Sequence, residues 1–280
     1  MAASDAVVIT GASTGIGEAC ALHLGKLGFR VFGGVRKEAD ADSLEVRASG
    51  RRIAPLFLDL TDRSSIISAA ETVAEATEEA GLWGLINNAG VAVAGPLEFL
   101  PIERLRRQLE VNVIGQLAVT QAFLPLLRKG GGRIVYIGSI SGRIATPLLG
   151  AYAASKFAME GLSDSLRREL RPWGIPVSIV DPGRVSTPIW KKSLAMADEL
   201  VNELPRRVLE LYGPVIEKEQ KTAIKAAEGG IRAEKVAQVV AHALMVKRPR
   251  TRYLVGPEAR LGALAARILP DSLLDRILTS

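Results

Sequence analysis

Two side chains that could exchange a proton with a substrate lie four residues apart in the segment YAASK. On a helix, Tyr152 and Lys156 would share one face, about one turn apart. A tyrosine has a pKa of about 10 and exchanges protons poorly at neutral pH, but a neighbouring ammonium group favours the phenolate and lowers that pKa. The pair therefore suits general acid/base chemistry, although the same spacing occurs on many ordinary helix surfaces.

Polar residues at three other places suit the same chemistry. Ser139 comes directly after the apolar run GRIVYIG, where its hydroxyl could bind a substrate oxygen beside Tyr152. The turn NNAG, residues 87–90, is suited to supporting a cofactor. Asn112 lies within the apolar helical run LEVNVIGQLAV, where a buried amide needs hydrogen-bond partners. It is either a structural residue or the holder of a water molecule beside Lys156.

The segment GASTGIG is typical of phosphate binding. Its glycines Gly11, Gly15 and Gly17 follow the apolar run AVVIT directly. They let the chain turn tightly and bring backbone N–H groups against a pyrophosphate, at the N-terminus of a helix expected to begin near Ile16. The spacing Gly-x3-Gly-x-Gly differs from the common dinucleotide fingerprint, and an ordinary strand-to-helix turn would look similar.

The residues after the second apolar run indicate which dinucleotide is bound. A carboxylate at this turn would bind the ribose hydroxyls of NAD, whereas an arginine would pair with the 2′-phosphate of NADP. The sequence reads GGVRKEAD and places Arg36 in the turn, followed by Lys37. NADP(H) is therefore favoured over NAD(H). Asp40 and Asp42 could reach a ribose from another loop geometry, which keeps NAD(H) as the alternative.

Seven short apolar runs predict the strands that position these residues. The runs are continuous rather than alternating, which is typical of strands buried on both faces of a parallel sheet. Longer segments with a helical period separate them, such as residues 65–80. This alternation predicts an α/β fold of Rossmann type, a doubly wound seven-stranded parallel sheet with its ligand crevice beyond the carboxyl ends of the strands. The runs begin at Ala6, Arg30, Arg52, Gly81, Gly132, Ile175 and Arg252.

The composition predicts one domain, residues 1–280. Of the 280 residues, 48% are hydrophobic, and neither a Gly/Ser-rich or Pro-rich linker nor a repeat divides the chain. The longest apolar stretch, VAQVVAHALMV from Val236, is too short to cross a bilayer. The N-terminal sequence lacks a basic leader, and the single Cys20 cannot form an internal disulfide. We therefore expect a cytoplasmic location.

The formal net charge of +6 raises nucleic acids, anionic membranes and anionic small molecules as partners. Basic residues cluster in KRPRTR, residues 247–252. Aromatic residues make up only 5% of the chain and do not alternate with the basic clusters, as a base-stacking surface would require. We therefore expect no nucleic-acid partner. No Cys/His cluster is present in the sequence, so no metal site is predicted either.

Taken together, these motifs make the chain resemble the short-chain dehydrogenase/reductase family. They occur in the family's order over roughly residues 6–190: TGASTGIG, Asp59 in LDL, NNAG, Asn112, Ser139, YAASK, and a Pro-Gly turn in DPGRVST. The combination is highly specific, although YAASK or the glycine turn alone would be a weak signal.

The resemblance implies a reversible hydride transfer between the nicotinamide and a carbonyl or alcohol carbon. It makes Tyr152 the general acid/base and Lys156 the residue that lowers the Tyr152 pKa and binds the nicotinamide ribose. Ser139 would orient the substrate oxygen, and Asn112 would anchor a proton-relay water. The expected cofactor contacts are Gly11, Ser13, Thr14, Gly15, Ile16, Gly17, Arg36, Asp59, Leu60, Asn88, Ala89, Gly90, Tyr152, Lys156, Pro182, Gly183, Val185 and Thr187.

Two segments outside the sheet pattern bear on the substrate. Residues 188–230 predict a mobile two-helix lid with an apolar underside, formed by Leu194, Met196, Leu200, Val201, Leu204, Val208, Leu209, Tyr212 and Ile216. Residues 258–280 predict a C-terminal amphipathic tail that closes the pocket, meets another subunit or makes peripheral contact with a membrane. Similar tails occur in relatives that act on steroids and retinoids, which favours a lipophilic alcohol or ketone.

Several alternatives remain beside this interpretation. An NAD(H)-dependent alcohol or steroid dehydrogenase would need only a different cofactor preference. A non-catalytic dinucleotide-sensing protein would keep the fold without turnover, although such proteins typically lose one of the catalytic groups. The resemblance also implies a homodimer or homotetramer, formed by the helix of residues 151–170 with Phe157, Leu162 and Leu166, and by its neighbour, residues 105–127.

Overall fold

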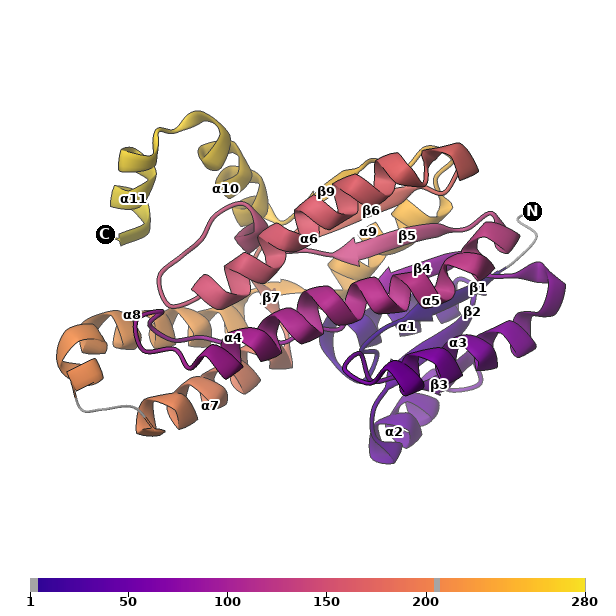
Figure 1. The fold of residues 1–280 in the computed structure, drawn as a ribbon, viewed down its shortest axis with the longest axis horizontal. Helices are drawn as coiled ribbons and strands as arrows, with labels where there is room; N and C mark the ends of the chain where they lie inside the picture. Colours follow the sequence, from indigo (N-terminus) through magenta and orange to yellow (C-terminus); the bar gives the residue numbers. More distant parts are fainter. Residues whose placement is uncertain (1–4, 204–206, 280) are drawn as a thin grey trace.

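The parallel sheet is the feature that positions everything else. A computed structural model describes residues 5–203 and 207–279. Within them, seven parallel strands form one sheet in the order β3-β2-β1-β4-β5-β6-β9 (Figure 1). All seven predicted strands are confirmed. Their bounds are β1 Ala6–Ile9, β2 Arg30–Val35, β3 Ile53–Phe57, β4 Gly84–Asn87, β5 Arg133–Ile137, β6 Val177–Pro182 and β9 Arg252–Val255.

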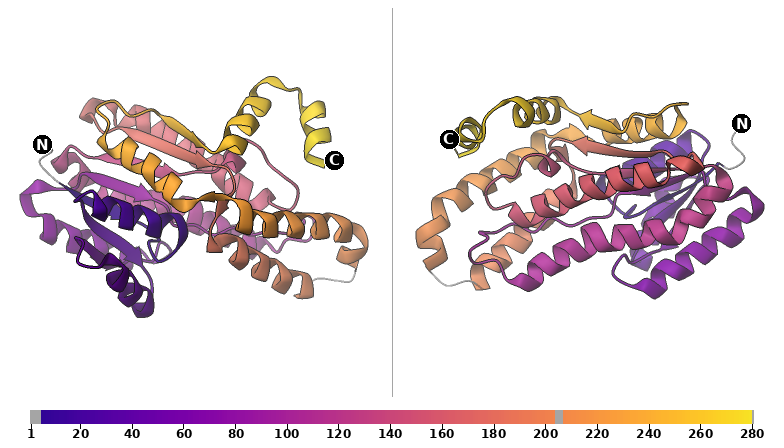
Figure 2. Two further views of the ribbon diagram at one scale, coloured as in Figure 1. Left: turned by 180° about the vertical axis from the view of Figure 1, so that it is seen from behind. Right: turned by 45° about the horizontal axis from the view of Figure 1, so that its top comes forward.

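Two apolar layers cover the sheet, which explains why the strands are apolar on both faces. In β1, Val7 and Ile9 point to one layer, while Ala6 and Val8 point to the other. The first layer is formed by α1 (Gly15–Lys26), α2 (Glu38–Ala48) and α9 (Ala233–Met245). The second layer is formed by α3 (Arg63–Thr77), α5 (Gly115–Gly130) and α6 (Gly150–Glu169), and Figure 2 shows both layers.

The strand order creates the crevice. β1 pairs with β2 on one side and with β4 on the other, with Val8 opposite Phe32 and Leu85. The connections leaving β1 and β4 run to different faces of the sheet, and their carboxyl ends therefore leave a gap at this point. The helix expected near Ile16 is α1, which begins at Gly15, directly after β1 and its turn.

The run from Ile102 to Gly130 is a single helical rod with a defect in it. α4 (Ile102–Leu109) passes through a π-helical turn, Glu110–Ile114, into α5. By length and composition alone, this rod could cross a membrane. However, Val119, Phe123 and Leu127 are buried against the sheet, as expected of a core helix.

A second, two-stranded sheet was not predicted. β7 (Val185–Ser186) pairs in parallel with β8 (Ile231–Arg232). Strands of two residues show no hydrophobic period, so the sequence carries no signal for them. The pairing connects the chain just before the predicted lid to the chain just after it.

The predicted lid is a pair of helices, α7 (Pro188–Glu203) and α8 (Arg207–Gly229), which extend beyond the sheet in Figure 1. Val208 and Ile216 are buried, as predicted. Leu209 is 51% exposed, so its placement on the underside was wrong. It follows Val208 directly and points about 100° away around the helix. The side chains of Leu200 and Val201, and Leu204 entirely, lie outside the described residues.

Other contacts hold α7 and α8 against the rest of the protein. Met196 packs against Val93 and Leu100. The Tyr212 hydroxyl donates to Glu98 at 2.8 Å, and its ring meets Phe99 edge to face.

The predicted tail also forms two helices, α10 (Pro257–Ile268) and α11 (Asp271–Thr279), which arch away from the sheet in Figure 1. The start of α10 is fixed by Glu258, which accepts a hydrogen bond from Arg184 Nε at 2.9 Å. On the outer side, Leu261, Leu264 and Ile268 are exposed.

Candidate active site

One cavity of about 860 Å³ lies beyond the carboxyl ends of the strands. Ser139, Tyr152 and Lys156 line it together with most of the predicted cofactor contacts. Among the described residues, the predicted site residues Gly17 and Asn112 do not line the cavity. The cofactor contacts that do are Gly11, Ser13, Thr14, Gly15, Ile16, Arg36, Asp59, Leu60, Asn88, Ala89, Gly90, Pro182, Gly183, Val185 and Thr187.

The glycine turn is built for close backbone approach. Gly11 has a φ of +66°, which is strained for any other residue. A Cβ at Gly17 would lie 2.1 Å from the Gly11 carbonyl oxygen and 2.4 Å from Asn88 Nδ2. Gly17 is therefore required for packing the turn, while Gly15 and Ile16, the first residues of α1, line the cavity. This cradle fits the pyrophosphate of a dinucleotide.

Asn88 holds the turn to the end of β4. Its Nδ2 donates to the carbonyls of Thr10 and Gly11 at 2.9 and 3.0 Å. The backbone N–H groups of Asn88 and Ala89 both donate to Thr10 Oγ1 at 2.9 Å. The NNAG turn thus holds the glycine turn in place by hydrogen bonds and also lines the cavity.

Asp59 and Arg36 line the cavity from beyond the carboxyl ends of β3 and β2. Asp59 Oδ1 accepts hydrogen bonds from the N–H and the hydroxyl of Thr61 at 2.9 and 2.8 Å. Burial opposes ionisation of Asp59, but these hydrogen bonds and the charges of Arg36 and Arg107 hold its pKa below the ordinary value. Asp59 is therefore an anion at neutral pH, and Arg36 is an exposed cation beside it.

Ser139 and Tyr152 both line the cavity, and the Ser139 side chain lies close enough to the Tyr152 hydroxyl to lower its pKa through a hydrogen bond. Ser139 follows β5, and Tyr152 lies in the first turn of α6. Lys156 extends one turn further along α6. Its Nζ donates to the carbonyl of Ile137 at 2.8 Å and lies 5.7 Å from the centroid of the Tyr152 ring.

Burial dominates the acid/base properties of this group. It raises the pKa of Tyr152, the hydrogen bond from Ser139 opposes the change, and the charge of Asp181 adds to it. Burial also lowers the pKa of Lys156 to about 8, against the charge of Asp181. The expected lowering of the Tyr152 pKa is therefore not found in this arrangement, because burial of the phenol outweighs the opposing effect, although Lys156 still carries its proton at neutral pH.

Asn112 does not face the cavity. Its Oδ1 accepts from the N–H of Val91 at 2.9 Å, and its Nδ2 donates to the Val91 carbonyl at 3.0 Å and to Ser155 Oγ at 3.1 Å. Both amide hydrogens are thus in use, so a relay water would have to bind an oxygen of Asn112, and this role stays a prediction. The side chain itself fixes the segment after β4 to the helix that carries Lys156.

Two further amides that sequence reasoning missed act in the same way. Gln108 donates to the Val91 carbonyl and accepts from the Val93 N–H, both at 2.7 Å, and Gln116 donates to the Ala89 carbonyl at 2.6 Å. Gln108, Asn112 and Gln116 follow one another at intervals of four residues in an apolar helical run. That spacing was the available signal for a polar face turned toward the site.

The segment after β6 closes the cavity near the glycine turn. Thr187 packs over Gly15, where an added Cβ would lie 3.3 Å from the Thr187 side chain. Trp190 Nε1 donates to the Val185 carbonyl at 2.8 Å. Apolar side chains from several elements form much of the remaining wall, namely Ile144, Leu148, Leu149, Leu194, Ile216, Ile277 and Leu278.

The doubly wound sheet, its glycine cradle and the Ser139, Tyr152 and Lys156 group define the class of oxidoreductases that use a nicotinamide dinucleotide. Residues 5–198 match the family model described as short chain dehydrogenase. The chain therefore belongs to the short-chain dehydrogenase/reductase family and is an NAD(P)-dependent enzyme of that family.

Curated relatives match along almost the whole chain. Retinol dehydrogenase 5 of Homo sapiens is 39% identical over 288 residues, covering 99% of this chain and 89% of the relative. The 3-amino-tetrahydro-pyrrolizinone reductase of Xenorhabdus hominickii is 38% identical over 277 residues, covering 96% and 93%. Both relatives are named as a dehydrogenase or a reductase.

Solved structures share the fold. A short-chain dehydrogenase/reductase from Burkholderia phymatum in complex with NAD has a TM-score of 0.79 at 25% identity and covers 98% of this chain and 95% of its own. A short-chain dehydrogenase from Burkholderia cenocepacia in complex with NADP has a TM-score of 0.76 at 26% identity and covers 100% of both. Proteins of this fold thus bind either dinucleotide, and the choice depends on each chain's own residues.

Proposed function

We propose that this protein catalyses reversible hydride transfer between NADP(H) and a carbonyl or alcohol group of a lipophilic substrate, with Tyr152 as general acid/base. The observation that carries the proposal is the placement of Tyr152, Ser139 and Lys156 on the cavity that also contains the glycine cradle. A substrate oxygen between the two hydroxyl groups would meet both a proton donor and an orienting hydrogen bond.

Each side chain has a distinct role in this proposal. When bound, the nicotinamide supplies or accepts the hydride. Tyr152 gives its proton to the substrate oxygen in reduction and takes it back in oxidation. Its raised pKa keeps the phenol protonated at neutral pH, which is the form that reduction needs. Ser139 holds the substrate oxygen, and Lys156 holds the nicotinamide ribose.

Arg36 supports the preference for NADP(H). It lines the cavity at the end where Asp59 lies, and its charge acts on the Asp59 carboxyl group. An arginine there can pair with the 2′-phosphate that distinguishes NADP from NAD. The solved neighbours include complexes with NADP and with NAD, so the proposed preference rests on Arg36.

The apolar cavity wall supports a lipophilic substrate. Leu194 and Ile216 from the helix pair, and Ile277 and Leu278 from the tail, face the same space as Tyr152. Apolar walls with a few polar groups favour ligands of matching chemistry. The relationship to retinol dehydrogenase 5 points in the same direction.

The test is NADPH consumption with a panel of ketones and aldehydes graded from small and polar to steroid-sized, with an amino ketone included. We expect kcat/KM to rise with substrate apolarity. Tyr152→Phe should lower kcat by about 100-fold or more while NADPH still binds, because only the proton transfer is lost. If NADPH binds and nothing turns over in either direction, either the substrate class is wrong or the protein is a dinucleotide sensor, and the proposal as stated fails.

We also infer a homo-oligomer formed through α5 and α6. Phe157 on α6 is 47% exposed, and Ile114, at the end of the π-helical turn just before α5, is 53% exposed. Leu162 and Leu166 are partly buried against the core, so they are less available than expected. Sedimentation should show a dimer or tetramer at micromolar concentration, and Phe157→Glu should shift it toward the monomer. A monomeric wild type would contradict the inference.

A further inference from the structure

A buried carboxyl group with no part in the proposed chemistry lies beside the catalytic centre. Asp181, in β6, is fully buried, and its Oδ1 has no hydrogen-bond partner among the described residues. The same atom lies against Gly138, where an added Cβ would be only 2.1 Å away. Gly138 stands between Ile137, whose carbonyl accepts the Lys156 hydrogen bond, and Ser139. Asp181 therefore borders the backbone turn that serves both catalytic side chains.

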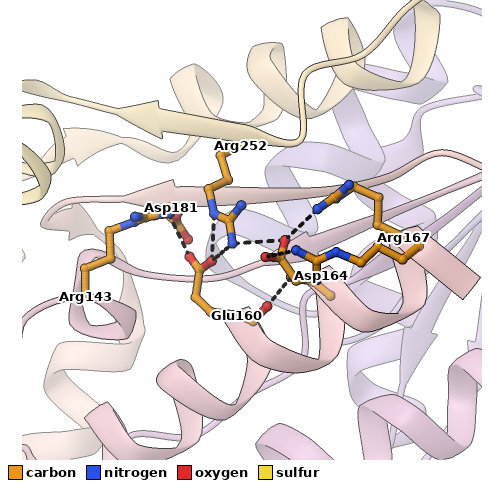
Figure 3. A network of polar contacts seen from close by, with 8 residues as sticks. Arg143, Glu160, Asp164, Arg167, Asp181 and Arg252 are labelled. Atoms are coloured by element: carbon orange, nitrogen blue, oxygen red, sulfur yellow. Dashed lines mark hydrogen bonds and ion pairs between the residues drawn. The ribbon is translucent and has the colours of Figure 1, made fainter.

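A chain of ion pairs joins Asp181 to the surface (Figure 3). Arg143 Nε lies 3.5 Å from Asp181 Oδ2, and Arg143 Nη2 lies 3.3 Å from Glu160 Oε1. Arg252 Nη2 lies 2.7 Å from Glu160 Oε2 and 3.1 Å from Asp164 Oδ1. Arg143 and Glu160 belong to the two segments that carry the catalytic serine and lysine, so the network fixes Asp181 relative to both.

The surroundings of Asp181 hold its carboxyl group in the neutral form. Burial and, after it, the neighbouring carboxyl group of Glu160 raise the pKa of Asp181 to about 8, against the opposing charge of Arg143. Asp181 is therefore largely neutral below pH 8 and becomes an anion above it.

The charge of Asp181 acts on both catalytic groups. It raises the pKa of Lys156, which burial lowers, and it raises the pKa of Tyr152. The Asp181 anion thus favours the ammonium form of Lys156. The Lys156 pKa of about 8 already includes this effect of Asp181, so both groups change charge in the same range and the Lys156 pKa would lie lower without the Asp181 charge.

We propose that Asp181 is a positioning residue: its carboxylate, placed behind the Gly138 turn, keeps Lys156 charged and in place in alkaline solution. Arg143 and Glu160 are the charged groups that face Asp181 from the loop after β5 and from α6. Arg252 and Asp164 reach it only through Glu160. The inference rests on the proposed function, because Lys156 matters through its hold on the nicotinamide ribose.

The test is the pH dependence of NADPH binding, followed by nucleotide fluorescence from about pH 6 to about pH 10. Asp181→Asn should lose NADPH affinity at a pH about one unit lower than the wild type, because a neutral amide cannot stabilise the Lys156 ammonium group. The alkaline limb of kcat/KM should move in the same direction. Coinciding binding profiles would overturn the proposal.

Asp164→Asn is the matched control. It removes a carboxylate from the outer end of the same network, where Asp164 contacts Arg252, Arg167 and Arg168. Its binding profile should keep the wild-type midpoint. If both variants lose affinity by the same factor at every pH, the network has only a structural role and the proposal is wrong.

Glu160→Gln tests the proposal through the opposite effect on the pH at which NADPH affinity is lost. It also serves if Asp181→Asn folds poorly. Without the charge of Glu160, Asp181 ionises more easily, so the alkaline loss of NADPH affinity should stay at the wild-type pH or move higher. A move to lower pH would contradict the proposal. If the wild type binds NADPH but reduces nothing, the proposed function fails, and the binding profiles still decide the role of Asp181. If NADPH does not bind, the same titration is made with NADH.

Discussion

Cofactor choice depends, at the scale of single residues, on the charge of Arg36. Arg36→Ala should weaken NADPH binding by about 10-fold or more and leave NADH binding unchanged, because a charged hydrogen bond to the 2′-phosphate is lost. Dissociation constants for both nucleotides measure this. Arg47→Ala is the control, since Arg47 is an exposed arginine on α2 that pairs with Glu18 instead. Equal weakening of both nucleotides by Arg36→Ala would count against the proposed preference.

Residues at the ends of elements were predictable, and residues defined by distant partners were not. Tyr152 and Lys156 are separated by one helical turn, and Ser139 directly follows a strand, so local pattern was sufficient to propose them. Asp181 is a candidate only because the fold brings it into contact with Arg143, 38 positions away, and with Gly138. No spacing in the sequence indicates that contact. The unpredicted rise in the Tyr152 pKa likewise comes from burial, which only the folded chain defines.

At the scale of elements, the C-terminal tail formed by α10 and α11 can be tested directly for a role in substrate binding. Ile277 and Leu278 of α11 line the cavity, which agrees with pocket closure, while Leu261, Leu264 and Ile268 on α10 are exposed and remain available for a membrane or another subunit. Ile277→Ser should raise KM for an apolar ketone several-fold without changing NADPH affinity. Leu273→Ser is the control, because Leu273 is exposed to a similar degree as Ile277, 42% against 56%, but is not among the residues that line the cavity.

Unchanged KM values in Ile277→Ser would show that α11 takes no part in substrate binding. A truncation for the same purpose has to keep β9, which ends at Val255. A cut after Tyr253 would divide β9, which pairs with β6 through Arg252–Val255, and would test the sheet rather than the tail.

Elements were predictable where a periodic pattern was long enough. Each of the seven strands shows a continuous apolar run, because helices cover both faces of the sheet. The stripe in α3 was also recognised, with Ile66, Ala69 and Val73 buried. β7 and β8 have two residues each and therefore no period. The misplacement of Leu209 arose because an apolar residue next to the stripe was counted as part of it.

At the scale of the whole molecule, the pH dependence of the free energy of unfolding should reflect the titration of Asp181. An unfolded aspartate loses its proton at about pH 3.9, whereas the folded protein keeps it on Asp181 up to about pH 8. Between these values the native state binds more protons, so the contribution of Asp181 to stability falls as the pH rises. Asp181→Asn should therefore gain stability relative to the wild type across this window, by an amount on the order of 1 kcal/mol or more.

Denaturant unfolding of the two proteins without nucleotide, at several pH values, measures this difference. Asp164→Asn should show no such trend above pH 5 or so, since its ion pairs with Arg252 and Arg167 lower the pKa of Asp164, against the effect of burial. A pH-independent difference between Asp181→Asn and the wild type would mean that Asp181 is already ionised in the native protein at acidic pH.

The strand order also determines when the sheet can be completed while the chain is being synthesised. β6 ends at Pro182, but its outer neighbour β9 begins only at Arg252, after the helix pair has been made. Until then, the edge of β6 has unpaired backbone groups next to the β-branched sequence VSIV, which is a ready template for pairing with another chain. Ribosome stalling or premature termination before Arg252 should therefore yield aggregating fragments rather than a smaller folded enzyme.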